Sequence, residues 1–102
     1  MFGYMKGRPL IGISGQEISE AVAQNYNLPV GIYITDVTSN SGADKAGILK
    51  GDILVSVAGK KVSAMKDLDD IKKSHHAGDT VNMAIMRDKK QLNLKLTFSE
   101  DR

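Results

Sequence analysis

The chain has 102 residues, 41% of them apolar and 25% charged, and 14 Lys and Arg against 12 Asp and Glu give a formal net charge of +2. This length supports one domain with its own core and is too short for two. The absence of cysteine excludes disulfides and thiolate metal sites. No apolar run approaches the roughly 20 residues that cross a bilayer, so we expect no membrane insertion by this chain.

The charge pattern argues against nucleic-acid binding. Lysine pairs occur at positions 60–61, 72–73 and 89–90, but each lies near an acidic residue, as in solvated turns and helix faces. The chain has three Tyr, two Phe and no Trp, so few rings are present to stack on bases. We expect no nucleic-acid partner and no cofactor.

Apolar spacing and turn residues predict a series of short elements. Strands are expected at residues 10–14, 31–37, 53–57, 80–87 and 91–98. Helices are expected at residues 17–26 and 63–74, the second with Ser63 as its N-cap, and one helical turn at residues 43–46 ends at Gly47. In the last strand, apolar residues alternate with polar ones, which predicts one buried face; they are Leu92, Leu94, Leu96 and Phe98.

Together these elements predict a mainly β fold with two helices. Its five or six strands would be mostly antiparallel and form a partly open barrel or sandwich capped by the helices. We expect a lead-in segment at residues 1–7, one domain at residues 8–99 and a polar tail at residues 100–102.

The segment 8–13 is the most informative part of the chain. An apolar-Gly-apolar step opens a strand here, and Gly12 lets successive N–H groups turn the same way and bind an anion. The terminal carboxylate of a peptide is such an anion. The residues predicted to bind it are Leu10, Ile11, Gly12 and Ile13, with Arg8 adding positive charge.

An apolar slot beside this segment would hold the last side chain of the peptide. Ile11 and Ile13 are expected to form its floor, and the helix at residues 63–74 would supply Leu68 and Ile71 as one wall, with Lys72 assigned to the same pocket. Its aliphatic lining favours a small or medium apolar terminal residue. The alternative is that Leu68 and Ile71 are ordinary core residues.

No catalytic constellation is apparent. The sequence around Ser14 is one residue short of a nucleophile elbow. His75 and His76 are adjacent in a predicted loop, where two neighbours seldom bind one metal ion. The acidic residues of the second helix spread over its outer faces. We therefore expect no enzyme activity from this chain.

Several motifs resemble the PDZ domains of bacterial HtrA (DegP-like) serine proteases over nearly the whole chain. Residues 7–13 resemble the carboxylate-binding loop of that family, and Tyr26-Asn27-Leu28-Pro29 resembles the end of its inserted helix. Residues 41–54 match its small-x-x-Ala-Gly-x-x-x-Gly-Asp signature, and residues 58–62 and 78–81 continue the match. Two residues depart from the family: Gly42 replaces a frequent proline, and Leu10 a frequent aromatic residue.

The resemblance implies a peptide-binding module. It would capture C-terminal or exposed hydrophobic ends of peptides or unfolded proteins by strand addition beside residues 11–14. It would thereby dock substrates to, or regulate, a serine protease domain upstream in a longer, extracytoplasmic protein of the cell envelope, anchored to the membrane or exported, that handles misfolded proteins. The alternatives are a PDZ module of another protease or of a secretion scaffold, and a domain that holds an oligomer together.

Overall fold

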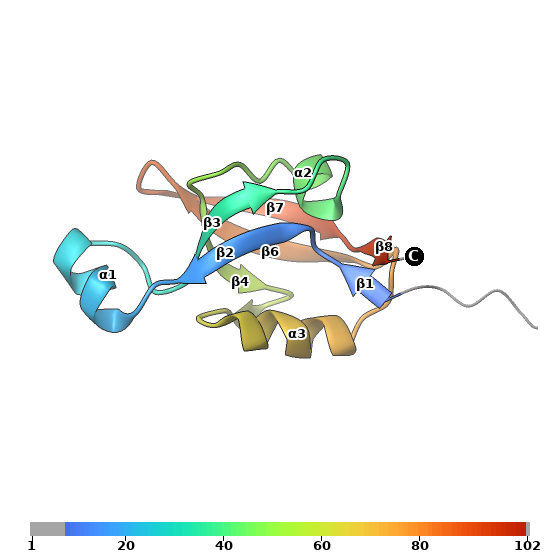
Figure 1. The fold of residues 1–102 in the computed structure, drawn as a ribbon, viewed down its shortest axis with the longest axis horizontal. Coiled ribbons are helices and arrows are strands. Elements are labelled where there is room, and N and C mark those ends of the chain that lie inside the picture. The colour runs from blue at the N-terminus through green and yellow to red at the C-terminus, as the bar shows by residue number, and fades with distance from the viewer. Residues whose placement is uncertain (1–7, 102) are drawn as a thin grey trace, which may run out of the picture.

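A computed structural model describes residues 8–101, so the predicted lead-in at residues 1–7 lies outside the described residues. Within residues 8–101, three helices are interspersed among the strands along the chain, as Figure 1 shows. The strands are β1 (Arg8–Leu10), β2 (Ile13–Glu17), β3 (Ile32–Val37), β4 (Ile53–Val57), β5 (Lys60–Lys61), β6 (Thr80–Arg87), β7 (Lys90–Thr97) and β8 (Ser99–Asp101). The helices are α1 (Glu20–Tyr26), α2 (Gly42–Ala46) and α3 (Met65–Lys73).

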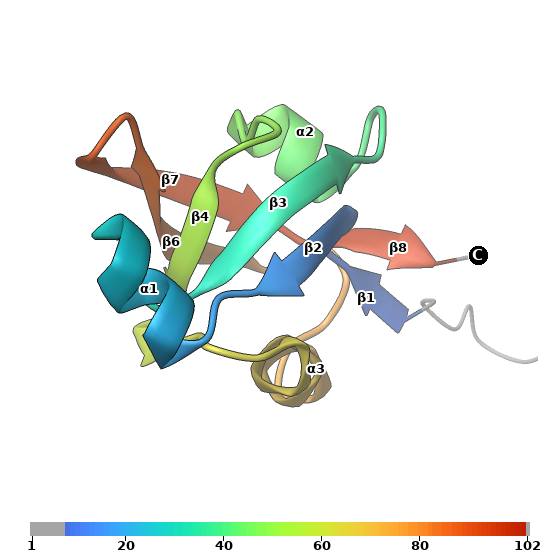
Figure 2. The same ribbon diagram turned by 60° about the vertical axis from the view of Figure 1, so that its left-hand side comes forward.

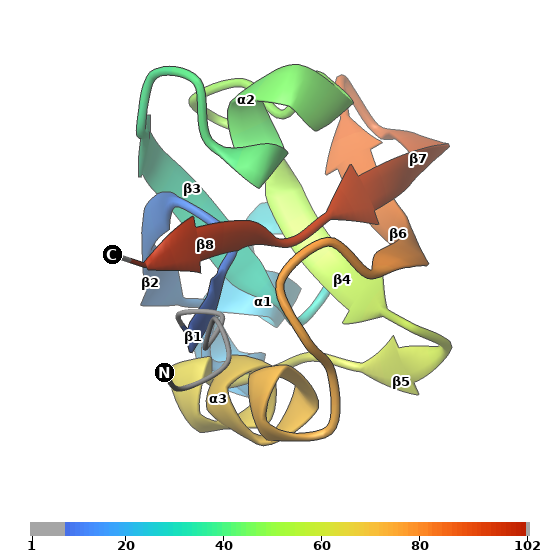
Figure 3. The same ribbon diagram turned by 90° about the vertical axis from the view of Figure 1, so that its right-hand side faces the viewer.

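Most of the strands form one antiparallel sheet in the order β2-β3-β4-β6-β7, with β5 paired to β4. The strands β1 and β8 form a separate two-stranded sheet. Figure 3 shows β8 between α2 and β1, with α3 on the far side of β1. The predicted mainly β fold is confirmed, and β2 and β7 are the two edges of the larger sheet.

The main core lies between the sheet and α3. It contains the inward residues of the central strands together with two residues of α3, all nearly inaccessible to solvent; they include Ile32, Ile34, Leu54, Ile85, Leu96, Leu68 and Ile71. A smaller cluster of Ile18, Ala23 and Ile53 lies under α1. Burial of these aliphatic side chains is the main favourable contribution to folding.

The N-terminal part of the chain differs from the prediction. The single strand expected at residues 10–14 is divided at Gly12, and β2 then continues to Glu17, where the sequence pattern predicted helix. Pairing with β3 holds residues 13–17 extended. Helix α1 therefore begins later, after Ser19, whose Oγ accepts a hydrogen bond from Val22 N at 3.2 Å.

The start of α3 also differs from the prediction, because Ser63 is not its N-cap. The Oδ2 atom of Asp67 accepts hydrogen bonds from Ser63 N at 2.9 Å, Ala64 N at 3.0 Å and Ser63 Oγ at 3.2 Å. The carboxylate thus holds the Ser63 hydroxyl as a donor, and the helix begins at Met65.

We expect the contribution of Asp67 to stability to depend on pH. The amide of Ser63, followed by that of Ala64, holds the pKa of Asp67 below its usual value of 3.8. Because the folded-state pKa is the lower one, this contribution is complete above about pH 4 and is lost as the pH falls through the folded value. In thermal melts followed by circular dichroism, Asp67→Asn should therefore lower Tm more at pH 6 than at pH 2.5.

The exposed Asp70 on the same helix supplies the control for this prediction. Asp70→Asn should change Tm by a similar, small amount at both pH values. A deficit of Asp67→Asn that is equally large at pH 2.5 and pH 6 would contradict the role given to the carboxylate.

The C-terminal hairpin agrees with its prediction. The strands β6 and β7 pair in register from Thr80↔Thr97 to Arg87↔Lys90. Leu96 is buried, whereas Leu92 and Leu94 are partly buried against the core. Past this hairpin, the backbone at the polar C-terminal end of the chain pairs as β8 with β1.

A buried ion pair fastens the loop before β4 to the end of β6. Asp52 is 2% exposed, and its carboxylate accepts hydrogen bonds from Arg87 Nε at 2.9 Å, Arg87 Nη2 at 2.7 Å and Leu49 N at 2.9 Å. Arg87 Nη2 also donates to the carbonyl of Gly47 at 2.8 Å. The bond to Asp52 raises the pKa of the Arg87 guanidinium above its usual range, so the guanidinium stays charged.

Candidate functional site

Three successive carbonyl groups at the junction of β1 and β2 point into the domain. Each accepts a hydrogen bond from a different part of the chain: the start of β8, the helix α2 and the residue that follows β3. The bonds run from Ser99 Oγ to Leu10 O at 3.1 Å, from Ala43 N to Ile11 O at 2.9 Å and from Thr38 N to Gly12 O at 2.9 Å.

The directions of these carbonyls fix the directions of the N–H groups that follow them. No cis peptide bond occurs among the described residues, and a planar trans peptide unit holds its C=O and N–H on opposite sides. The N–H groups of Ile11, Gly12 and Ile13 therefore point away from the three donors. In Figure 2, β8, α2 and the end of β3 lie on one side of β1 and β2, and α3 lies on the other. This geometry gives three neighbouring amides directed to the side of α3.

Gly12 is required at the centre of this loop. Its φ angle is +90°, and a Cβ built on it would overlap Cβ and Oγ of Ser41. Ser41 is 6% exposed, and its hydroxyl accepts a bond from Asp44 N at 3.2 Å while donating to Gly12 O at 3.5 Å. The N-cap of α2 thus supports the loop from behind.

The outer edge of β2 carries a row of backbone groups that face away from the sheet. Bonds from Thr38 N to Gly12 O and from Ile18 N to Gly31 O show that residues 12 and 18 face β3. The irregularity in the pairing adds a residue to β3 rather than to β2. Because alternate residues of a strand face opposite neighbours, residues 13, 15 and 17 direct their N–H and C=O groups outward. This edge can accept another strand.

The helix α3 runs beside this free edge. The N–H of Met65, in the first turn of α3, donates to Glu17 Oε2 at the end of β2 at 3.2 Å. The start of α3 therefore lies by the end of β2, and Figure 2 shows the helix below β2 and β1. The loop with the three amides precedes the start of β2, and Glu17 lies at the end of β2, beside the start of α3.

The predicted pocket residues differ in how much of their surface is exposed. Ile11, Leu68 and Ile71 are 2–3% exposed and belong to the main core, which accords with the alternative of ordinary core residues. Ile13 is partly buried against that core. Lys72 keeps its amine 3.2 Å from the carboxylate of Asp69. The assignment of these residues to a ligand pocket stays a prediction.

The sequence did not identify the residues that hold the loop in place, which are Thr38, Ser41, Ala43 and Ser99. A serine before a short helical turn is a recognisable N-cap signal, so Ser41 could have been assigned that local role. The bond between Ser99 and Leu10 spans 89 positions and leaves no local signal. The side chain of Arg8, predicted to add positive charge, lies outside the described part of the structure.

Among the remaining candidates for chemistry, His75 has a structural role. His75 Nδ1 lies 2.8 Å from the carbonyl of Ile71, and its ring packs on Phe98 with centroids 5.4 Å apart. The part of the chain that the structure describes contains no cluster of three His, Cys, Asp or Glu residues suited to a metal ion. Within residues 8–101, none of the helices has the length and apolar character needed to span a bilayer.

Comparisons with known proteins agree with this geometry. The family model for the PDZ domain matches residues 9–98. The periplasmic pH-dependent serine endoprotease DegQ of Escherichia coli is 35% identical over 99 residues, which cover 95% of this chain and 22% of DegQ. The serine protease Do-like HtrA of Bacillus subtilis is 35% identical over 104 residues, covering 91% of this chain and 23% of that protein. The chain thus spans less than a quarter of either relative.

Among solved structures, the HtrA3 PDZ domain bound to a phage-derived ligand superposes with a TM-score of 0.77 at 22% identity, covering 92% of this chain and 88% of that one. This likeness concerns the fold. With the family match over residues 9–98, it gives the identity of the domain: the chain belongs to the PDZ domain family, and within it resembles the PDZ domains of HtrA-type serine proteases.

Proposed function

We propose that this domain captures the C-terminal end of an extended peptide. The terminal carboxylate would accept hydrogen bonds from the N–H groups of Ile11, Gly12 and Ile13, and the preceding peptide backbone would pair with the free edge of β2 as an added strand. The last apolar side chain would lie against Ile13 in the space before α3. The observation that supports this proposal most strongly is the set of three inward carbonyls, because it aims three successive amides outward together.

The energetics favour modest affinity. A hydrogen bond to a charged group contributes about 1.5–3 kcal/mol, so three of them are a substantial gain. An unstructured peptide loses conformational, translational and rotational freedom on binding, which offsets much of that gain. We therefore expect a Kd on the order of micromolar for a short peptide, corresponding to about −8 kcal/mol.

In a longer protein, the domain would dock substrates to an attached serine protease or regulate it. DegQ and the Bacillus HtrA, which this chain resembles over less than a quarter of their length, are serine proteases. The HtrA3 PDZ domain holds a ligand as an isolated domain, which supports binding without the protease. Since DegQ is periplasmic, we place the present domain in the cell envelope, where exposed hydrophobic ends of misfolded proteins are its expected ligands.

Calorimetry with a valine-terminated peptide and its C-terminal amide tests the proposal. The two peptides have the same side chains and differ in charge and in one acceptor oxygen. We expect the acid to bind at least about tenfold more tightly, a difference of about 1.4 kcal/mol. Equal affinity for acid and amide would refute carboxylate capture. A phenylalanine-terminated pair, run in parallel, reports the size of the terminal pocket.

A further inference from the structure

We propose that Ser99 in β8 is a positioning residue for carboxylate capture, and that it couples an occupied site to the pairing of β1 with β8. This inference rests on the proposed function. Ser99 lies one residue beyond the segment that matches the family model, which ends at residue 98. Its hydroxyl donates to Leu10 O at 3.1 Å, and this carbonyl belongs to the same peptide unit as the N–H of Ile11.

The first of the three amides is therefore oriented by the last strand of the described chain. The strands β1 and β8 form a two-stranded sheet of their own, in which Leu10 lies opposite Ser99 and Arg8 lies opposite Asp101. The peptide unit between Leu10 and Ile11 is rigid and planar. A rotation that breaks the bond to Ser99 also turns the Ile11 N–H away from the direction shared with Gly12 and Ile13.

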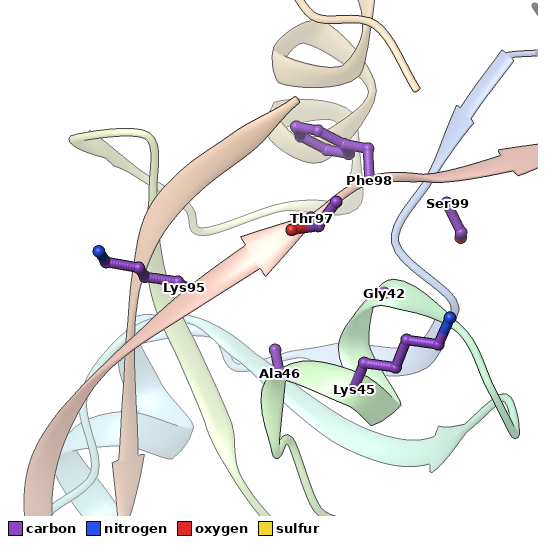
Figure 4. A pocket seen from close by; sticks show the side chains of 7 residues that line it. All are labelled: Gly42, Lys45, Ala46, Lys95, Thr97, Phe98 and Ser99. Atoms are coloured by element: carbon purple, nitrogen blue, oxygen red, sulfur yellow. The ribbon is translucent and has the colours of Figure 1, made fainter. Parts of the chain in front are cut away.

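The surroundings of Ser99 suit a positioning role rather than a packing role. Figure 4 shows Ser99 at the border of a hollow of about 300 Å³ between α2 and the end of β7. Its lining includes Gly42 and Lys45 of α2 and Thr97 of β7. Because the hollow is next to the hydroxyl, removing that hydroxyl forces no repacking of the core. Water can then replace the hydroxyl bond to Leu10, and the peptide unit, still paired through the backbone of β1 and β8, is held less firmly in its direction.

The coupling works in both directions. A carboxylate bound to the Ile11 N–H polarises the peptide unit and strengthens the bond that the Leu10 carbonyl accepts on its other side. By linkage, whatever stabilises the bond between Leu10 and Ser99 also favours carboxylate binding, and by the same factor. Peptide capture should therefore hold the first and last described strands together more tightly.

The first experiment compares the ratio of acid to amide affinity, by calorimetry, in the wild type and three variants. Ser99→Ala should reduce the ratio by about threefold to tenfold, the range of a 0.6–1.4 kcal/mol coupling. Ser99→Thr keeps a hydroxyl and should retain most of the ratio. Thr97→Ala is the matched control, because its hydroxyl lies 2.8 Å from that of Thr80 rather than at the loop, and its ratio should equal that of the wild type.

The second experiment measures amide hydrogen exchange of β1 and β8 with saturating acid or amide peptide. The acid should slow exchange in these two strands more than the amide does, and Ser99→Ala should remove that difference. The turn between β6 and β7 serves as the internal reference. Wild-type affinities that are equal for acid and amide would refute the proposed function itself. A wild type that discriminates, with a Ser99→Ala variant that discriminates equally well, would overturn the role of Ser99 alone.

Discussion

Replacing Asp52 by alanine is expected to lower the free energy of unfolding by about 2–4 kcal/mol, below the 3–5 kcal/mol typical of a fully buried broken pair. Asp52 is 2% exposed, so water does not readily replace the hydrogen bonds that its carboxylate makes. Its loss removes the bidentate contact with Arg87 and the bond from Leu49 N. The Arg87 side chain is 29% exposed and can turn toward solvent, which explains the lower estimate.

Urea unfolding and thermal melts measure this loss. For a domain of this size, each kcal/mol lowers Tm by about 4–8 °C, so the loss of about 2–4 kcal/mol corresponds to a drop of roughly 8–30 °C. Asp36→Ala supplies the control, because Asp36 pairs with Lys50 at 3.7 Å with both side chains more than 60% exposed. Exposed pairs contribute about 0–1 kcal/mol. If Asp52→Ala were no less stable than Asp36→Ala, the buried pair would have no special role in fastening the loop before β4.

The elements with strong local signals could be predicted from the sequence. Clean alternation predicted the last strand, and a polar turn of Asp88 and Lys89 marked the hairpin; both residues have positive φ angles, of 53° and 64°. The limits of β4 also agree with the prediction. These patterns show which side chains face the core. Burial selects apolar residues at alternate positions of one strand, so the signal lies within a few neighbouring residues.

The predictions that were wrong involve competition between local and distant partners. The first strand was expected to end at Ser14 and the helix to begin at Glu17, but pairing with β3 keeps residues 15–17 extended. At the start of α3, Ser63 is a good N-cap by type, but the carboxylate of Asp67 holds its hydroxyl and its amide. The hydroxyl of Ser63 and the carboxylate of Asp67 can both accept hydrogen bonds from amides at the start of a helix. A propensity scale cannot predict which of them does so, because that depends on the path of the chain before the helix.

The candidate site likewise combines features that have a local sequence signal with features that depend on distant residues. Gly12 and its apolar neighbours indicated outward amides, because glycine permits the required backbone turn. The donors that fix those amides come from Thr38, Ala43 and Ser99, which lie 26 to 89 positions away from the carbonyls they bind. The sequence thus indicated the loop at residues 10–13 as a candidate site but not the residues that hold it in place.

Substituting Gly12 by alanine is expected to have the largest effect on peptide binding. The residue has φ of +90°, and its Cβ would overlap Ser41, a buried residue that caps α2 and cannot move without breaking its bond to Asp44. Left-handed backbone costs an L-residue about 1–2 kcal/mol, and the overlap adds to it. The loop should relieve both by rotating, which turns the amides of Gly12 and Ile13 out of alignment. Affinity for the acid peptide should fall by at least about tenfold, or 1.4 kcal/mol.

Gly59→Ala separates the two causes of this effect. Gly59 has a φ of +78°, but a Cβ placed there meets nothing within 4 Å. The control therefore carries backbone strain without overlap, far from the loop in the turn between β4 and β5. It should lose about 1 kcal/mol of stability and keep the preference for the acid peptide. The two variants share the backbone strain and differ in the contact with Ser41, so a difference in peptide binding between them reports the effect of that contact. If Gly12→Ala bound the acid peptide as tightly as the wild type does, the direction of these amides would not govern recognition.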